Sequence, residues 1–276
     1  MKVLDDYDKQ KLFNFIKTKE LFKNFDYSTI GELCTFNVDG NGKNIRGRVE
    51  ILSTEPLKFR IMLQNDILNT FSISTSSQAT VFHEFCHCLE IATTLKHYNF
   101  YTLHNRPQDN TWQLLFSTAI ECWGEYFAYF HSCKLRKETR VLTPKIKNLY
   151  LYKQLFSKNF NHDDSIKYVE ELWDGIVNMI RTTVILAACY HSTGDIQYAN
   201  ELHLQNTHPK YNILDDYIKN IVQYFHQLYE TYPQWVSKDK FIEIGYTLFS
   251  LIKYLDLNFS TNDLSDSFML KYCPKQ

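Results

Sequence analysis

The sequence predicts an α+β fold, with a small antiparallel sheet near the N-terminus and a mostly helical remainder. Three short β-prone runs, 33–38, 45–52 and 57–63, lie close together, and the Asp-Gly-Asn-Gly segment at 39–42 is typical of a hairpin turn. From Thr75 onwards apolar residues recur at helical spacing, with weak stops between the segments. A run of strands followed by a run of helices indicates the α+β class.

The first element is expected to be an amphipathic helix over residues 5–25, because its apolar residues share one side at helical spacing. The β-prone runs follow, and residues 70–73 can add a further short strand. The next helix is expected over residues 77–96, since Thr75 and Gln78 can form a capping box and neither glycine nor proline interrupts the stretch. Later helices are expected near residues 110–135, 143–158, 163–192, 211–230 and 239–256.

Composition and charge bear on the class of function. With 276 residues, 44% of them hydrophobic, the chain can bury a sizeable core. Its formal net charge of -1 gives no overall field that would attract nucleic acid or an anionic membrane. The first residues lack the pattern of a secretory signal, and the longest apolar run, residues 182–190, is too short to cross a bilayer. We therefore expect a cytoplasmic protein with no nucleic-acid or membrane partner, and the oligomeric state is not predicted.

An H-E-x-x-H motif lies within the helix expected over residues 77–96, formed by His83, Glu84 and His87. Residues four apart lie one turn apart on the same helix face, so both imidazoles can bind one metal ion. Glu84 can take a proton from water at the metal without being a ligand itself. A random chain of this composition would contain only roughly 0.02 such pentapeptides, so chance is a poor explanation. Two histidines on a half-exposed helix remain the structural alternative.

The third ligand is expected on the next helix, in the run Ala-Ile-Glu-Cys-Trp-Gly-Glu-Tyr-Phe-Ala at 119–128. Catalytic zinc usually has three protein ligands and an open position for water. Glu121 and Glu125 lie four apart on an otherwise apolar helix, where buried carboxylates need a partner. We assign Glu121 as the third ligand and Glu125 as an outer acceptor for the N–H of a ligand histidine. The reverse assignment stays open, as does an ordinary solvated acidic pair.

A hydrolytic site also needs a donor that stabilises the negative tetrahedral intermediate. The sequence offers several candidates: Tyr126, His131, Arg181, Tyr190 and His191. We favour His191, which follows a long apolar helical stretch and lies next to Tyr190. The alternative is a helix-end histidine whose positive charge favours the negative end of the helix dipole.

The combination of H-E-x-x-H with E-x-x-x-E on a later helix resembles the gluzincin clan of zinc metallopeptidases. The short strands before the motif and the run at 121–128 resemble, more narrowly, bacterial ImmA/IrrE-type metallopeptidases. The resemblance covers about residues 30–135. It implies one Zn²⁺ ion per chain, held by His83, His87 and Glu121, with Glu84 as the general base. The clan often has aspartate four residues after the ligand glutamate, where this chain has Glu125.

The function that this resemblance implies is hydrolysis of peptide bonds in a protein or peptide substrate, by an endopeptidase rather than an exopeptidase. Residues 1–140 would form the zincin-like catalytic core, with the N-terminal helix and the small sheet, and residues 141–276 a helical region that completes or caps the cleft. One continuous domain is the alternative. The alternative is a catalytically silent, zinc-containing regulatory or protein-binding module. A zinc hydrolase that acts on other amides is a third interpretation, because the same chemistry suits several amide substrates.

Overall fold

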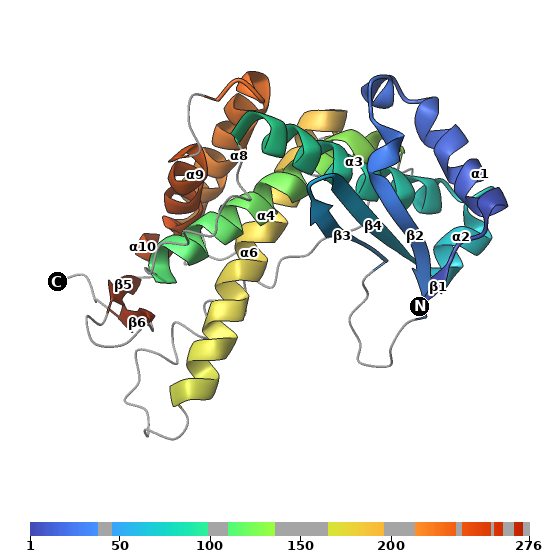
Figure 1. Ribbon diagram of the computed structural model, residues 1–276. Helices are drawn as coiled ribbons and strands as arrows, with labels where there is room; N and C mark the ends of the chain where they lie inside the picture. Colours follow the sequence, from blue (N-terminus) through green and yellow to red (C-terminus); the bar gives the residue numbers. More distant parts are fainter. Residues whose placement is uncertain are drawn as a thin grey trace. The chain divides into compact units, whose positions relative to one another are not determined.

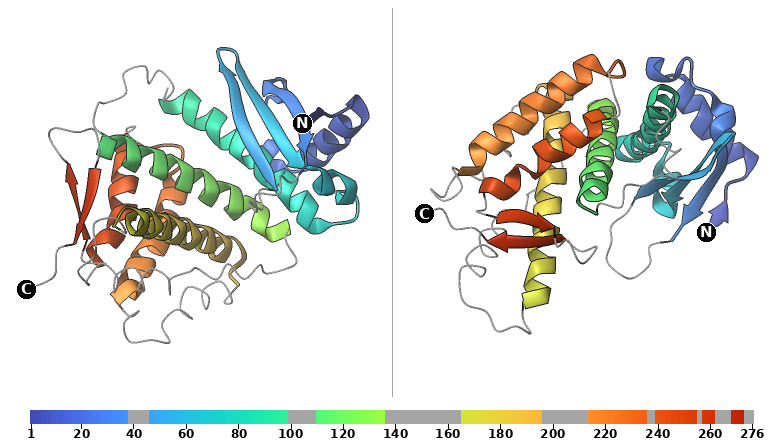
Figure 2. Two further views of the ribbon diagram at one scale, coloured as in Figure 1. Left: turned by 90° about the horizontal axis from the view of Figure 1, so that it is seen from below. Right: turned by 60° about the vertical axis from the view of Figure 1, so that its left-hand side comes forward.

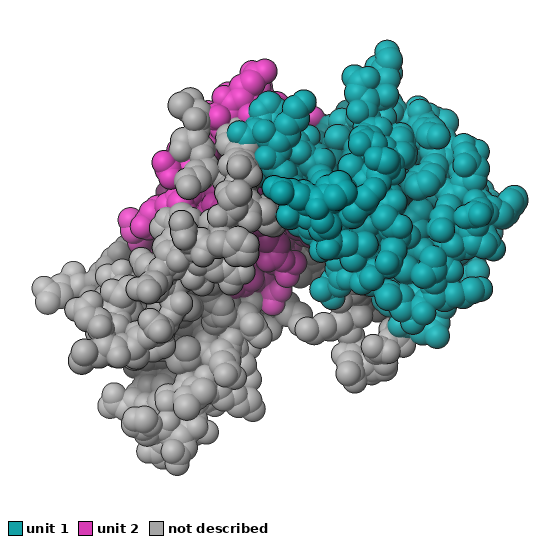
Figure 3. Space-filling model, in the orientation of Figure 1, with its two compact units in different colours: residues 1–101, 127–139 teal, residues 102–126, 140–276 magenta. Residues whose placement is uncertain are grey.

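A computed structural model describes residues 1–37, 46–98, 110–135, 165–195, 213–235, 239–254, 257–261 and 268–272. The chain forms two compact units, shown in different colours in Figure 3: residues 1–101 with 127–139, and residues 102–126 with 140–276. Residues 102–126 group with the later helices in this division. The helix α4 (Asn110–Ser132) runs unbroken through both units, and its last turns, from residue 127, belong to the first unit.

The first unit contains a four-stranded mixed sheet with the strand order β1-β2-β4-β3 (Figure 1). Its strands are β1 (Lys2–Val3), β2 (Ile30–Phe36), β3 (Gly47–Thr54) and β4 (Leu57–Gln64). The β1–β2 and β3–β4 pairs are antiparallel, but β2 and β4 are parallel. The expected α+β class is confirmed, and the expectation of a wholly antiparallel sheet is wrong.

The parallel pair arises because β4, rather than β3, lies beside β2. The chain reverses between β2 and β3 and again between β3 and β4, so β4 runs in the same direction as β2. Burial agrees with β4 as an inner strand and β3 as an edge strand. Phe59, Ile61 and Leu63 of β4 are fully buried, whereas the residues of β3 are at most half-buried. The hairpin turn expected at 39–42 lies outside the described residues.

Three helices complete the first unit: α1 (Asp6–Lys17), α2 (Asn65–Thr70) and α3 (Thr75–Tyr98). The first helix is shorter than expected, and residues 70–73 form a helix end and a turn instead of a strand. The hydroxyl of Ser74 accepts a hydrogen bond from the Ser77 N–H at 3.3 Å at the start of α3. The helix α3 packs against β3 and β4, and it buries Phe82 and Phe85 beside Phe22.

The second unit is built from α4 together with α6 (Ser165–Thr193), α8 (Ile213–Thr231), α9 (Asp239–Phe249) and α10 (Leu251–Tyr254) (Figure 2). Aromatic side chains form much of its core: Trp123 of α4 stacks with Phe225 of α8, and Phe116 of α4 contacts Phe241 of α9. An antiparallel pair, β5 (Leu257–Thr261) and β6 (Phe268–Tyr272), follows the helices and was not expected. The helix expected at 143–158 lies outside the described residues.

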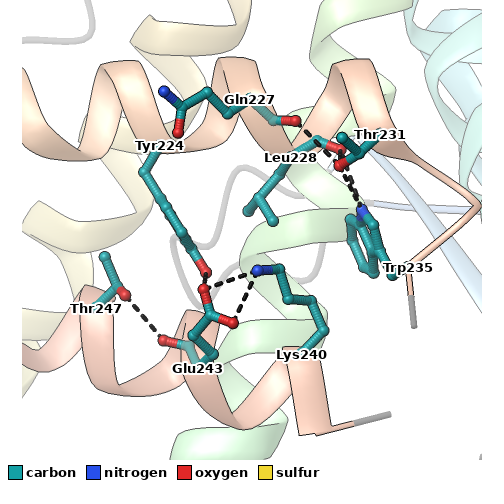
Figure 4. Close-up of polar contacts among 8 residues, drawn as sticks. All are labelled: Tyr224, Gln227, Leu228, Thr231, Trp235, Lys240, Glu243 and Thr247. Carbon is teal, nitrogen blue, oxygen red and sulfur yellow. Dashed lines mark hydrogen bonds and ion pairs between the residues drawn. The ribbon is translucent and has the colours of Figure 1, made fainter. Parts of the chain in front are cut away.

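Polar contacts also join α8 to α9 in the second unit (Figure 4). The Tyr224 hydroxyl donates to Glu243 at 3.0 Å, and the Lys240 ammonium lies 2.7 Å and 2.8 Å from the two carboxylate oxygens of Glu243. These groups are largely at the surface, where such pairs orient helices but stabilise them little. None of the described helices has the length and apolar character needed to span a bilayer.

Gly245 of α9 lies close to the backbone of α4. A Cβ atom at Gly245 would lie 2.6 Å from the carbonyl oxygen of Leu115, a backbone atom that cannot turn aside. The overpacking in Gly245→Ala should cost about 1–3 kcal/mol, more than the gain in helix propensity offsets. We expect a lower melting temperature by circular dichroism. Gly31→Ala is the control, since its Cβ would have its nearest neighbour at 3.4 Å. Equal melting temperatures for the two variants would contradict this packing.

Candidate metal centre

The H-E-x-x-H motif lies in the middle of α3, as expected, and its two histidines converge. The Nε2 atoms of His83 and His87 are 3.1 Å apart, and the ring centroids are 4.7 Å apart. Two nitrogens bound to one tetrahedral Zn²⁺ at about 2.0–2.1 Å would lie roughly 3.3 Å apart. The helix therefore presents the two nitrogens at close to the separation that a single ion requires.

Glu125 completes a group of three candidate ligands with His83 and His87. Each of the three residues offers a ligand atom, and these atoms lie within 4.8 Å of one another. The last turns of α4 lie against His83, because the Tyr129 ring packs on the His83 ring with centroids 4.6 Å apart and an interplanar angle of 70°. Glu125 lies one turn before Tyr129 on the same helix face. Two imidazoles and one carboxylate form a donor set that suits zinc.

Glu121, our expected third ligand, is not part of this group. Its carboxylate forms an ion pair with Arg181 of α6, and the two side chains are 48% and 39% exposed. Since α4 meets His83 through its C-terminal turns, Glu121 lies about 6 Å further from the contact along the helix axis than Glu125. The geometry therefore matches the reverse assignment that the sequence left open, with Glu125 beside the histidines.

Burial keeps the side chains of His87, Cys86 and Cys88 neutral. Desolvation lowers the pKa of His87 to about 4, so its imidazole is uncharged at neutral pH, which is the form that binds metal. Cys86 and Cys88 are free and buried, and burial raises the pKa of both thiols well above the usual range. These thiols stay protonated and pack in the core of the first unit.

Glu84 is buried, with 5% of its surface exposed, and its side chain extends towards the first residue of β3. A Cβ atom at Gly47 would lie 2.4 Å from the Glu84 Oε1 atom and 2.6 Å from its Cδ atom. The carboxylate therefore occupies room that only glycine leaves. Sequence reasoning missed Gly47, because a glycine at the start of a strand is too common to indicate a neighbour.

His191, our candidate donor, lies near the end of α6 in the second unit. Its Nδ1 atom is 2.6 Å from the Tyr126 hydroxyl, and its ring lies 4.7 Å from that of His226. Burial and the neighbouring His226 lower the pKa of His191 to about 4. A neutral imidazole does not fit the alternative of a positive charge at a helix end. The role of His191 in stabilising an intermediate stays a prediction.

Comparison of the chain with protein-family models, curated proteins and solved structures gave no match. The fold and the three converging side chains are therefore the basis for a functional assignment. The fold class is α+β, and the group His83, His87 and Glu125 is a candidate metal-binding site.

Proposed function

We propose that this chain is a zinc-dependent peptidase, in which His83, His87 and Glu125 bind one Zn²⁺ ion and Glu84 is the general base. The observation that carries the proposal is the convergence of two Nε2 atoms and a carboxylate beside a buried glutamate that is not among the three ligands. The resemblance of the H-E-x-x-H segment to that of gluzincins suggests the peptide bond as the substrate, although the ligand glutamate is then Glu125 and not the first glutamate of the E-x-x-x-E segment.

Glu84 favours an enzyme over a structural zinc site. Structural sites usually close all four positions with protein ligands, whereas catalytic sites use three and leave one for water. Among the residues that the structure describes, the candidate group has three members, and the buried Cys86 and Cys88 do not belong to it. A structural site needs no general base, whereas a hydrolytic site does.

Each residue would have a defined part in hydrolysis. Zinc in this group would supply Lewis-acid chemistry, lowering the pKa of water and polarising the substrate carbonyl. The Glu84 carboxylate would accept a proton from the attacking water and pass it to the leaving amine. Burial of Glu84 and of His83 would exclude bulk water from the proton path. We propose protein or peptide substrates and cleavage within the chain.

Metal content and peptide cleavage test the proposal together. We expect protein purified without added metal to hold about one zinc ion, and to cleave unfolded proteins or peptide mixtures followed by mass spectrometry. A strong chelator should remove both properties, and added zinc should restore them. Zinc without cleavage would favour the catalytically silent regulatory or protein-binding module. Protein that holds no metal and cannot be loaded would overturn both functions.

Gly47→Ala should reduce turnover without releasing zinc. The added methyl group would displace the Glu84 carboxylate, and misplacing a catalytic group by about 1 Å can cost about 10²-fold in rate. None of the three proposed ligands is moved directly, so the zinc content should stay at the wild-type value. Gly31→Ala is the matched control, because it adds the same methyl group where the nearest atom is 3.4 Å away. Equal kcat values for the two variants would contradict the contact.

A further inference from the structure

The C-terminal half of α4 presents three functional groups on one face. Glu125, Tyr129 and Ser132 follow the spacing i, i+4 and i+7, which places them on the same side of a helix. Glu125 belongs to the candidate metal group, and the Tyr129 ring packs on His83. The Ser132 hydroxyl lies 3.4 Å from the Nδ1 atom of His83. Ser132 is completely buried, so bulk water does not compete for this contact.

The two nitrogens of His83 therefore have different neighbours. Nε2 lies 3.1 Å from the Nε2 atom of His87, on the side of the candidate ligands, and Nδ1 faces Ser132. A neutral imidazole carries one proton, so an Nε2 atom that binds metal leaves the proton on Nδ1. The Nδ1–H group can only donate, and the serine oxygen can accept.

We infer that Ser132 is a positioning residue, whose hydroxyl accepts a hydrogen bond from Nδ1–H of His83 and so keeps Nε2 free for the metal ion. The inference rests on the proposed zinc site. Ser132 takes the outer role that the sequence suggested for Glu125, which lies among the ligand atoms instead. The distance of 3.4 Å is longer than the usual range of about 2.7–3.2 Å, and we expect it to shorten when a metal ion draws on the ring.

Tyr129 supports the same orientation by a different contact. Its ring meets the His83 ring nearly edge to face, which limits rotation of the imidazole about its Cβ–Cγ bond. Ser132 selects the tautomer, and Tyr129 restricts the plane of the ring. Outer contacts of this kind typically change metal affinity by about 10–100-fold when they are lost.

The test compares the zinc affinity of the full-length wild type, Ser132→Ala and Ser132→Thr by competition with a chromophoric chelator. We expect about 10–100-fold weaker binding for Ser132→Ala and near wild-type binding for Ser132→Thr, which keeps the hydroxyl. The melting temperature of metal-free Ser132→Ala should stay close to the wild-type value, which separates positioning from folding. Equal affinity for the wild type and Ser132→Ala would overturn the inference.

A second measurement needs no variant. Nitrogen-15 NMR of histidine-labelled wild-type protein reports which ring nitrogen of His83 carries the proton. We expect the proton on Nδ1, and a proton on Nε2 would overturn the inference. Failure of the proposed function gives a different pattern: the wild type binds zinc and cleaves no peptide, while Ser132→Ala still binds zinc more weakly.

Discussion

Glu84→Gln is expected to reduce peptide hydrolysis by about 10²–10⁴-fold while the protein keeps its zinc. Glutamine has nearly the same size as glutamate, so it fits the room that Gly47 leaves beside α3. Its amide cannot accept a proton from the attacking water, and the three proposed ligands stay in place. The measurement is kcat/KM for a peptide that the wild type cleaves, together with the zinc content of both proteins.

Glu90→Gln is the matched control for this variant. Glu90 lies on the same helix with 3% of its surface exposed, and its carboxylate accepts a hydrogen bond from the Thr94 hydroxyl at 2.5 Å. The same change of a buried carboxylate to an amide is made outside the candidate ligand group, so turnover should be retained. Wild-type turnover in Glu84→Gln would exclude Glu84 as the base. Loss of zinc from Glu84→Gln would instead make it a ligand.

Local sequence patterns predicted the parts of the molecule that depend on local geometry. The spacing of His83 and His87 places both imidazoles on one helix face whatever the rest of the fold, and the structure has them on α3. The α+β class also follows from local patterns, because strands and helices have different hydrophobic periods. These features depend on residues within one or two turns of each other.

Contacts between distant segments could not be predicted in this way. The parallel pairing of β2 with β4 depends on which of two strands is better buried in the finished sheet. Gly47 at the start of β3 lies against Glu84 of α3. Ser132 of α4 lies against His83 of α3, 49 residues away in the sequence. Nothing in the spacing of these residues indicates the contact, because it depends on how separate elements pack.

Glu125→Ala is expected to lose zinc, whereas Glu121→Ala should retain it. The two residues lie on the same helix one turn apart, and only Glu125 offers an oxygen to the group with His83 and His87. Removing one of three ligands should weaken zinc binding by more than the about 10–100-fold that loss of an outer contact causes. The measurement is zinc content after dialysis, followed by competition with a chelator.

Glu121→Ala is also informative by itself, because it breaks the ion pair with Arg181. That pair is about half exposed, so its loss should change the free energy of unfolding by about 0–1 kcal/mol and leave zinc bound. The opposite result, with zinc lost from Glu121→Ala and kept by Glu125→Ala, would restore the assignment that we favoured from sequence. In that case the histidines of α3 would have to contact α4 one turn closer to the N-terminus of α4. That shift would also separate Ser132 from His83. The two glutamate variants therefore test the ligand set and the register of the two helices in one experiment.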